Sequence, residues 1–246
     1  MRSSILGLVC LLAIGPAAAA GDSSGEPIQL TLTWNISLDA QGHVERIAAM
    51  PNPRADRVPQ IRERLEQEIR GWAFVSGTVD GRPAATETVL SATVTLQPAA
   101  ADSFRVVFND VRTGGRIAKA VPPKYPHASV QHHETGMVVL RVDYDANGTV
   151  RSAAVDPDSP GAAQRLIDAS LAAVNQWTFQ PERVDGHGVP GTQSLPVCFA
   201  LSPVGSHAAP ACEWTPRGKH APIGEGESIA LNPAARLAND VAGHAL

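Results

Sequence analysis

The 246-residue sequence has few cysteines, only three, and no large excess of charge of either sign, with 20 basic and 24 acidic residues. This near balance gives no sign of the basic surface that nucleic acids bind. The sequence also lacks a Gly-x-Ser-x-Gly motif, a phosphate-binding loop and a dinucleotide fingerprint. The carboxylates that can be placed fall in turns, caps and helix faces. We therefore expect no enzyme activity, no cofactor, no small-molecule substrate and no nucleic-acid partner.

The spacings typical of metal sites are absent as well. His127, His132, His133 and His187 lie in the second half of the chain, with Glu134 beside two of them. Three histidines and a carboxylate could hold zinc, but neither a His-Glu-x-x-His helix nor a Cys-x-x-Cys pair is present. His132 and His133 are adjacent, so on a strand they would point to opposite faces. We interpret these residues as exposed loop histidines and expect no metal.

The N-terminal segment has the pattern of a secretory signal peptide. Arg2 precedes an apolar run over Ile5–Ile14, which is followed by Gly15-Pro16 and the small residues Ala17–Ala20. This segment is short for a membrane span of about 20 residues. We expect residues 1–20 to be cleaved and the protein to enter the periplasm. Retention would instead anchor it in the inner membrane.

Cleavage of this leader would remove Cys10 and leave Cys198 and Cys212. Two closely spaced cysteines in an exported chain suggest a disulfide. Closing so short a loop would contribute about 3 kcal/mol on the chain-entropy model. Two unpaired thiols are the alternative interpretation.

Hydrophobic periodicity predicts strands and helices in both halves of the chain. The first half has predicted strands at 30–38, 44–49, 90–96 and 104–108, and a helix from the cap Asp56 to Trp72. The second half has predicted strands at 138–144, 150–155 and 195–201, and a helix from Ser159 to Val174. Pro196 cannot donate to a ladder, which favours a sheet edge for the last strand. We expect a connector at 113–124 and an irregular tail at 205–246, with a short helix near 233–241.

Three motifs recur in the same order at nearly one offset. Asp39-Ala-Gln-Gly42 matches Asp145-Ala-Asn-Gly148, and Trp72-Ala-Phe74 matches Trp177-Thr-Phe179-Gln-Pro181 over its first three residues. Val79-Asp-Gly81 also matches Val184-Asp-Gly186, and the offsets are 105 or 106 residues. We interpret this recurrence as a tandem duplication of a β-β-α-β unit. We expect the motif residues to have structural rather than chemical roles: Gly42, Trp72, Phe74, Gly148, Trp177, Phe179 and Pro181.

The order Tyr125-Pro126, then Asp-x-x-Gly, then Trp-x-Phe-x-Pro resembles the C-terminal domain of TonB, a periplasmic energy transducer of Gram-negative bacteria. The resemblance implies an α+β fold in which a small antiparallel sheet packs against one helix. We expect a degenerate module of this kind at 24–112, a second module at 113–204 and the tail at 205–246. The first module has Val75-Ser76 where the second has Gln180-Pro181.

The resemblance also implies a function in TonB-dependent transport, because the family uses its last strand to hold a short segment of an outer-membrane receptor by strand addition. The expected partner-binding residues are Tyr125, Pro126, Gln193, Ser194, Leu195, Val197 and Phe199. Two alternatives stay open. The same edge could be covered by the first module or the tail, which would leave an envelope scaffolding or assembly protein. A homodimer is also compatible with the sequence.

Overall fold

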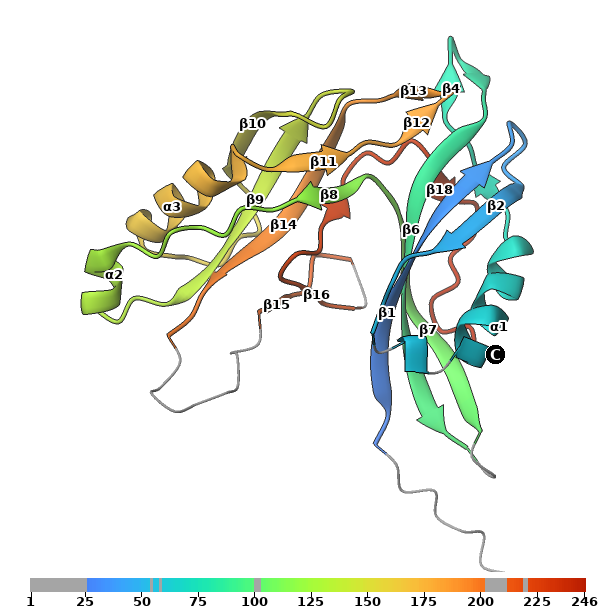
Figure 1. Ribbon diagram of the computed structural model, residues 1–246, viewed down its shortest axis with the longest axis horizontal. Helices are drawn as coiled ribbons and strands as arrows, with labels where there is room; N and C mark the ends of the chain where they lie inside the picture. Colours follow the sequence, from blue (N-terminus) through green and yellow to red (C-terminus); the bar gives the residue numbers. More distant parts are fainter. Residues whose placement is uncertain (1–25, 54, 58, 100–102, 202–211, 219–220) are drawn as a thin grey trace, which may run out of the picture.

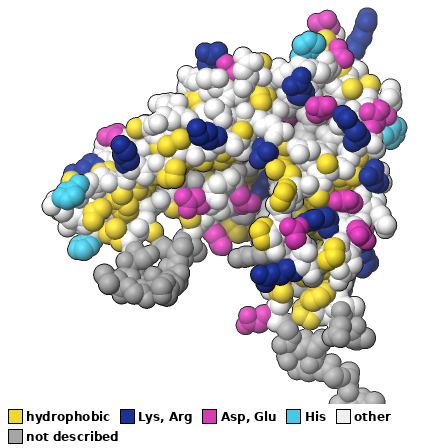
Figure 2. Space-filling model, in the orientation of Figure 1, with side chains coloured by type: hydrophobic (Ala, Val, Ile, Leu, Met, Phe, Trp, Pro, Cys, Tyr) yellow, Lys and Arg dark blue, Asp and Glu magenta, His cyan; other side chains and the backbone are white. Residues whose placement is uncertain are grey.

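Two antiparallel sheets with one helix packed against each form the framework of this computed structural model (Figure 1). The structure describes residues 26–53, 55–57, 59–99, 103–201, 212–218 and 221–246. The predicted signal peptide lies outside these residues. Within the described ranges, no helix has both the length and the apolar character needed to cross a bilayer. Acidic and basic side chains are interspersed on the face shown in Figure 2.

The first sheet consists mainly of four strands in the order β2-β1-β6-β7, and the short strands β12 and β13 extend it beside the start of β6. The bounds of the elements in this part of the chain are β1 Ile28–Leu38, β2 Val44–Ala49, a 3₁₀ turn Ala55–Arg57, α1 Pro59–Arg70, β3 Phe74–Val75, β4 Thr78–Val79, β5 Arg82–Pro83, β6 Thr86–Pro98 and β7 Phe104–Gly114.

The second sheet has the order β10-β9-β14-β17, and β8 pairs separately with β11. The bounds of the remaining elements are β8 Arg116–Lys119, α2 His127–Gln131, β9 Gly136–Tyr144, β10 Val150–Val155, α3 Gln164–Val174, β11 Thr178–Gln180, β12 Arg183–Val184, β13 His187–Gly188, β14 Gly191–Phe199, β15 Glu213–Trp214, β16 Ile223–Gly224, β17 Ile229–Ala230 and β18 Arg236–Leu237.

Each sheet has its own hydrophobic core. In the first, the even-numbered apolar residues of β1 from Leu30 to Leu38 pack with Ile61, Leu65 and Ile69 of α1. In the second, Val138, Leu140, Val142 and Tyr144 of β9 pack with Leu166 and Val174 of α3. The predicted strand positions are confirmed here because alternation places one apolar face of each strand on a helix. Phe74, Trp177 and Phe179 are buried, whereas Trp72 is only partly buried against its core.

Two predicted helix starts are wrong. Helix α1 begins at Pro59, and Asp56 lies in the preceding 3₁₀ turn, where it pairs with Arg62. Helix α3 begins at Gln164 rather than near Ser159. The Ser159 hydroxyl accepts the backbone N–H of Val139 at 2.9 Å, so it supports the edge of β9 instead of capping a helix.

Backbone pairing also changes the predictions for the connector and the tail. Strand β7 runs to Gly114, and β8 pairs with β11, so much of the predicted connector is strand. The predicted helix near 233–241 is wrong, because β18 pairs with β3 and the N–H of Ala238 donates to the Ala73 carbonyl. The last predicted strand ends at Phe199, two residues before its expected end.

The two Asp-x-x-Gly turns have the same geometry. Gly42 and Gly148 have φ values of +88° and +82°. The N–H of Phe74 donates to the Gly42 carbonyl at 3.1 Å, and the N–H of Phe179 donates to the Gly148 carbonyl at 2.8 Å. A Cβ on either glycine would lie within 2 Å of the phenylalanine carbonyl oxygen, at 1.8 Å and 1.9 Å respectively. Glycine is therefore required where the segment after each helix crosses the turn.

The aspartate that opens each turn also repeats. Asp39 accepts the N–H of His43 at 2.8 Å, and Asp145 accepts the N–H of Thr149 at 3.0 Å. These backbone hydrogen bonds to the ionised carboxylate are the main reason that the pKa values of both aspartates are lowered.

The C-terminal segment pairs with strands from both halves of the chain. Strand β18 pairs with β3, and β17 pairs with β14. Residues Gly243–Leu246 run along the outer side of β7: the N–H of Phe108 donates to the His244 carbonyl at 2.9 Å, and the N–H of Leu246 donates to the Val106 carbonyl at 2.8 Å. Leu246 packs against the first core. This segment therefore pairs backbone groups that would otherwise lie on exposed sheet edges.

Glu182, which lies between β11 and β12, joins the first sheet to the C-terminal segment. Its side chain is buried, accepts the Thr88 hydroxyl at 2.6 Å and accepts the N–H groups of Ala234 at 2.6 Å and Ala235 at 3.2 Å. Burial raises the pKa of this carboxyl group, although the three hydrogen bonds lower it in part.

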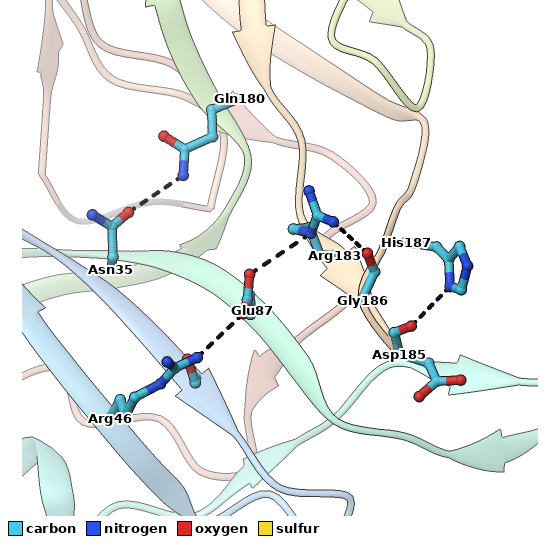
Figure 3. A network of polar contacts seen from close by, with 9 residues as sticks. Asn35, Arg46, Glu87, Gln180, Arg183, Asp185, Gly186 and His187 are labelled. Atoms are coloured by element: carbon cyan, nitrogen blue, oxygen red, sulfur yellow. Dashed lines mark hydrogen bonds and ion pairs between the residues drawn. The ribbon is translucent and has the colours of Figure 1, made fainter.

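A more exposed polar network lies close by (Figure 3). Glu87 stands between Arg46, at 3.3 Å, and Arg183, at 3.8 Å, and the Gln180 amide donates to Asn35 at 3.4 Å. Exposed pairs of this kind contribute little to stability. The buried Glu182 contacts therefore hold the segment between β11 and β12 more strongly to the first sheet than this exposed network does.

We predict that Gly148→Ala destabilises the protein far more than Gly186→Ala. Gly186 has a similar φ of +74° but open space around its Cβ position, so the substitution should cost about 1–2 kcal/mol from the backbone conformation alone. In Gly148→Ala the new methyl group also meets the Phe179 carbonyl, and we expect a loss of more than about 3 kcal/mol. Urea unfolding of both variants measures the difference, and equal losses would contradict the close approach.

We also predict that Glu182→Gln changes how stability depends on pH. A carboxyl whose pKa is raised by folding stabilises the native state below its unfolded pKa, and this contribution is lost as pH rises through the folded pKa. The wild type should therefore lose stability relative to Glu182→Gln as pH rises from 4 toward neutrality. The variant should also lose about 1–3 kcal/mol of unfolding free energy, because the amide nitrogen that replaces Oε2 cannot accept the Ala234 N–H. Parallel urea-unfolding profiles between about pH 4 and pH 8 would refute the titration.

Candidate protein-binding edge

Strand β14 contains five of the seven residues that the sequence predicted to bind a partner. Its neighbour on the inner side is β9 over the whole length of the strand, from Gly191 opposite Tyr144 to Phe199 opposite Gly136. Leu195, Val197 and Phe199 are buried in the second core. Their side chains therefore hold β14 in place, and a partner beside this strand would meet its backbone first.

The outward backbone groups of β14 belong to alternate residues. The N–H of Leu231 donates to the Thr192 carbonyl at 2.9 Å, and the Asn232 side chain accepts the N–H of Thr192 at 2.9 Å. Since successive residues of a strand point their backbone groups to opposite sides, Ser194, Pro196 and Cys198 face the same way as Thr192. Strand β17 lies opposite Gln193 and Ser194. Beyond Ser194, no strand in the described part of the chain pairs with this side of β14.

Pro196 and Cys198 define what this unpaired stretch can offer. Pro196 lies opposite Val139, whose own N–H and carbonyl bond to Ser159 and Asp156 on the far side of β9. The backbone of Pro196, which has no N–H, therefore faces outward. The ladder between β9 and β14 needs no donor from this residue. Cys198 forms the predicted disulfide with Cys212, with a Cα–Cα distance of 5.9 Å.

Gln193 is buried between the two sheets rather than exposed for a partner. Its amide donates to the Gly115 carbonyl at 2.9 Å and to the Tyr144 hydroxyl at 3.4 Å. Its Oε1 has no hydrogen-bond partner among the described residues. The Tyr144 ring stacks on Phe179 at 4.8 Å between centroids, and burial raises the pKa of its hydroxyl. Gln193 therefore links β14 to the segment between β7 and β8.

Tyr125 and Pro126 lie at the other end of β14, next to Phe199. The Tyr125 ring meets the Phe199 ring edge to face at 5.2 Å, and its hydroxyl donates to the Glu134 carbonyl. Burial raises the pKa of this hydroxyl. Pro126 precedes α2 with φ of −65°. The structure thus brings Tyr125 to the end of the predicted binding strand, where part of its ring remains accessible.

The histidines singled out in the sequence are exposed. His127, His132 and His133 lie in or directly after α2, whereas His187 is in β13. Glu134 pairs with Arg165, and the nearby side chains of Ser129 and Arg165 lower the pKa of Glu134. Among the described residues there is no group of three or more side chains placed to hold a metal ion.

The sequence did not identify two features that matter for this edge. Glu182 follows Pro181 without any motif, and its burial results from contacts with residues that are distant in sequence. Strand β17 does have a weak signal, since Ile229-Ala230-Leu231 is a short apolar run within a polar tail. Its partner could not have been deduced from that run.

Comparison with known proteins places this edge in a family. Residues 121–201 match the model of the Gram-negative bacterial TonB protein C-terminal domain. Over 81 residues the chain is 38% identical to Protein TonB of Xanthomonas campestris pv. campestris, both in strain B100 and in strain ATCC 33913. The aligned part covers 33% of this chain and 35% of each relative, so the chain spans about a third of the length of the curated relatives it matches. No solved structure matches the chain. Residues 121–201, which contain β9, β10, β14 and α3, are therefore similar to the TonB C-terminal domain.

Proposed function

We propose that this chain is a TonB-like envelope protein that binds a segment of an outer-membrane receptor along the outer side of β14, as a non-catalytic component of TonB-dependent transport. Two observations carry the proposal: the family match over 121–201, and an outward side of β14 at Pro196 and Cys198 with which no strand of the described residues pairs. An extended receptor segment would add to the sheet here, and Tyr125 would contact it near Phe199.

The chemistry of the open stretch limits how tightly it can bind. Pro196 offers a carbonyl, and Cys198 offers a carbonyl and an N–H, which allows about three main-chain hydrogen bonds at roughly 1 kcal/mol each. A dissociation constant of 1 mM already corresponds to about 4 kcal/mol. Tighter binding needs side-chain contacts. Hydrophobic side chains gather at the end of the molecule where α2 lies (Figures 1 and 2), and Val130 of α2 is 40% exposed there.

A second candidate function is an envelope scaffolding or assembly module without a transport role. The pairing of β17 with Gln193 and Ser194 favours this alternative, because the chain itself occupies part of the edge. The disulfide at Cys198 also restricts what can approach the end of β14. In this case the edge contributes stability and offers no binding site.

We further propose that residues 24–112 and 113–204 are tandem copies of one module, followed by a tail at 205–246. Support comes from the matched turns at Gly42 and Gly148, the matched contacts to Phe74 and Phe179, and two hairpins with the same backbone. Asp80 and Gly81 have φ values of +50° and +76°, and Asp185 and Gly186 have +49° and +74°. Both pairs have the positive φ values that two-residue hairpin turns require.

For its location, we propose export to the periplasm with cleavage near Ala20. The expected result is an intact mass, measured on protein from the native envelope fraction, that lacks about the first twenty residues. A mass that retains Met1–Ala20 would contradict cleavage and favour a membrane-anchored transducer.

The binding proposal predicts local changes in the amide spectrum of β14. Addition of a synthetic peptide copying an extended periplasmic segment of an outer-membrane receptor should shift the amide signals of Ser194, Cys198 and their neighbours. The amides of β10, at the opposite edge of the sheet, are the internal control. The absence of shifts at millimolar peptide would refute receptor binding. Slow hydrogen exchange at Cys198 in the free protein would support the scaffolding alternative.

A further inference from the structure

The segment Ile229–Asn232 shows how an extended chain fits against β14. Ile229 lies opposite Ser194 and Ala230 lies opposite Gln193, in antiparallel register. The N–H of Leu231 donates to Thr192, and the Asn232 side chain accepts from Thr192. This short segment therefore makes the type of contact that the proposed receptor segment would make, at the adjoining part of the same edge.

The side chains of this segment have different surroundings. Ile229 is 6% exposed, so its side chain occupies a buried position. The Ala230 methyl group lies beside Gly114, where a Cβ on that glycine would come within 2.3 Å of it. Leu231 is 44% exposed, and Asn232 supplies an oxygen acceptor in place of a backbone carbonyl. The site thus favours an aliphatic residue at the position of Ile229, a small residue at that of Ala230 and a hydrogen-bond acceptor at that of Asn232. It accepts any residue at the exposed position of Leu231.

We propose that Ile229–Asn232 is an internal stand-in for the partner, and that a partner segment with the pattern aliphatic, small, any residue, Asn or another acceptor binds antiparallel to Thr192–Ser194 by replacing it. This inference rests on the proposed function, which it deepens by naming the chemistry of the bound segment. Replacement extends the binding edge from Cys198 back to Thr192. It adds the outward backbone groups of Thr192 and Ser194 to those of Pro196 and Cys198.

The internal segment is suited to exchange because its hold on β14 is local. Only two residues of β17 pair with β14, and Leu231 adds one N–H. As part of the same chain, however, it is present at a high effective concentration, which an added peptide must overcome. Weakening the internal segment should therefore strengthen binding of an added peptide.

The test uses the full chain and a synthetic peptide with its own sequence from Glu227 to Ala234. Leu231→Pro removes the N–H that donates to Thr192, and Leu231→Ala is the matched control, since both lose the leucine side chain. We expect the peptide to bind Leu231→Pro about three- to tenfold more tightly than Leu231→Ala, the effect of one hydrogen bond. A peptide carrying Ile229→Asp should bind neither variant measurably, because it would bury an unpaired charge at the position that Ile229 occupies.

Equal affinity of the peptide for the two variants, or unchanged binding by the Ile229→Asp peptide, would overturn the inference. Amide spectra of β9 and β10 establish that both variants keep the fold. A parallel titration with the receptor peptide distinguishes failure of the exchange inference from failure of the proposed function. Shifts in β14 without shifts at Ile229 and Leu231 would overturn exchange but keep receptor binding. Binding of the internal peptide without binding of any receptor peptide would support exchange and overturn the receptor role.

Discussion

The backbone groups at the outer strands of the two sheets impose the constraint on which much of this structure depends. A strand at a sheet edge presents N–H and C=O groups that must be paired, hydrated or covered. Here the C-terminal segment pairs with β3, β7 and β14 in turn. Among the described strands, β2 and β10 each end a sheet without a further partner strand. At the end of β14 a further outward stretch has no partner strand, and there Pro196 removes a donor and the disulfide restricts approach. The same chemistry that completes the fold is thus available for binding.

The paired edges also fix the relation between the two sheets. Strands β12 and β13 come from the TonB C-terminal family region, yet they extend the first sheet beside β6. Glu182 precedes them and accepts hydrogen bonds from both Thr88 and the C-terminal segment. A buried carboxyl with several partners is costly to disturb, because removal of one group leaves the others unpaired. The C-terminal segment that pairs with the edge of β14 is therefore also held to the first sheet through Glu182.

The position of β17 connects the proposed receptor binding at β14 with the proposed replacement of β17 by a partner segment. Strand β17 lies between β14 and β7, so its release would alter contacts to both sheets. Gln193 makes a related connection on the inside, since its amide reaches the Gly115 carbonyl after β7. A segment that replaces β17 would be in contact with both parts of the chain. Binding at this end of β14 would then change contacts of the first sheet, whereas binding near Phe199 would change contacts of the second sheet alone.

Much of the local structure could be predicted from the sequence. Alternation in β1, β6 and β9 and the helical spacing in α1 and α3 depend only on which side chains are apolar. The Asp-x-x-Gly turns and the Trp-x-Phe motifs were recognisable, and they carry the family resemblance in residues 121–201. The disulfide between Cys198 and Cys212 followed from cysteine number and spacing. The helix starts at Asp56 and Ser159 were wrong because a capping residue is equally able to bind a side chain or a neighbouring strand.

Tertiary structure alone decided which strands meet and which polar groups are buried. The sequence of the tail does not reveal that Ile229 lies on β14 or that Arg236 lies on β3, because two-residue pairings depend on the edges available after the sheets have formed. It does not show that Gln193 faces inward, since a glutamine on a strand is compatible with either environment. The sequence by itself thus determined the individual strands, the turns and the family resemblance of residues 121–201. The folded chain decided how much of the β14 edge remains open, because edge pairing depends on distant backbone groups and not on local residue preference.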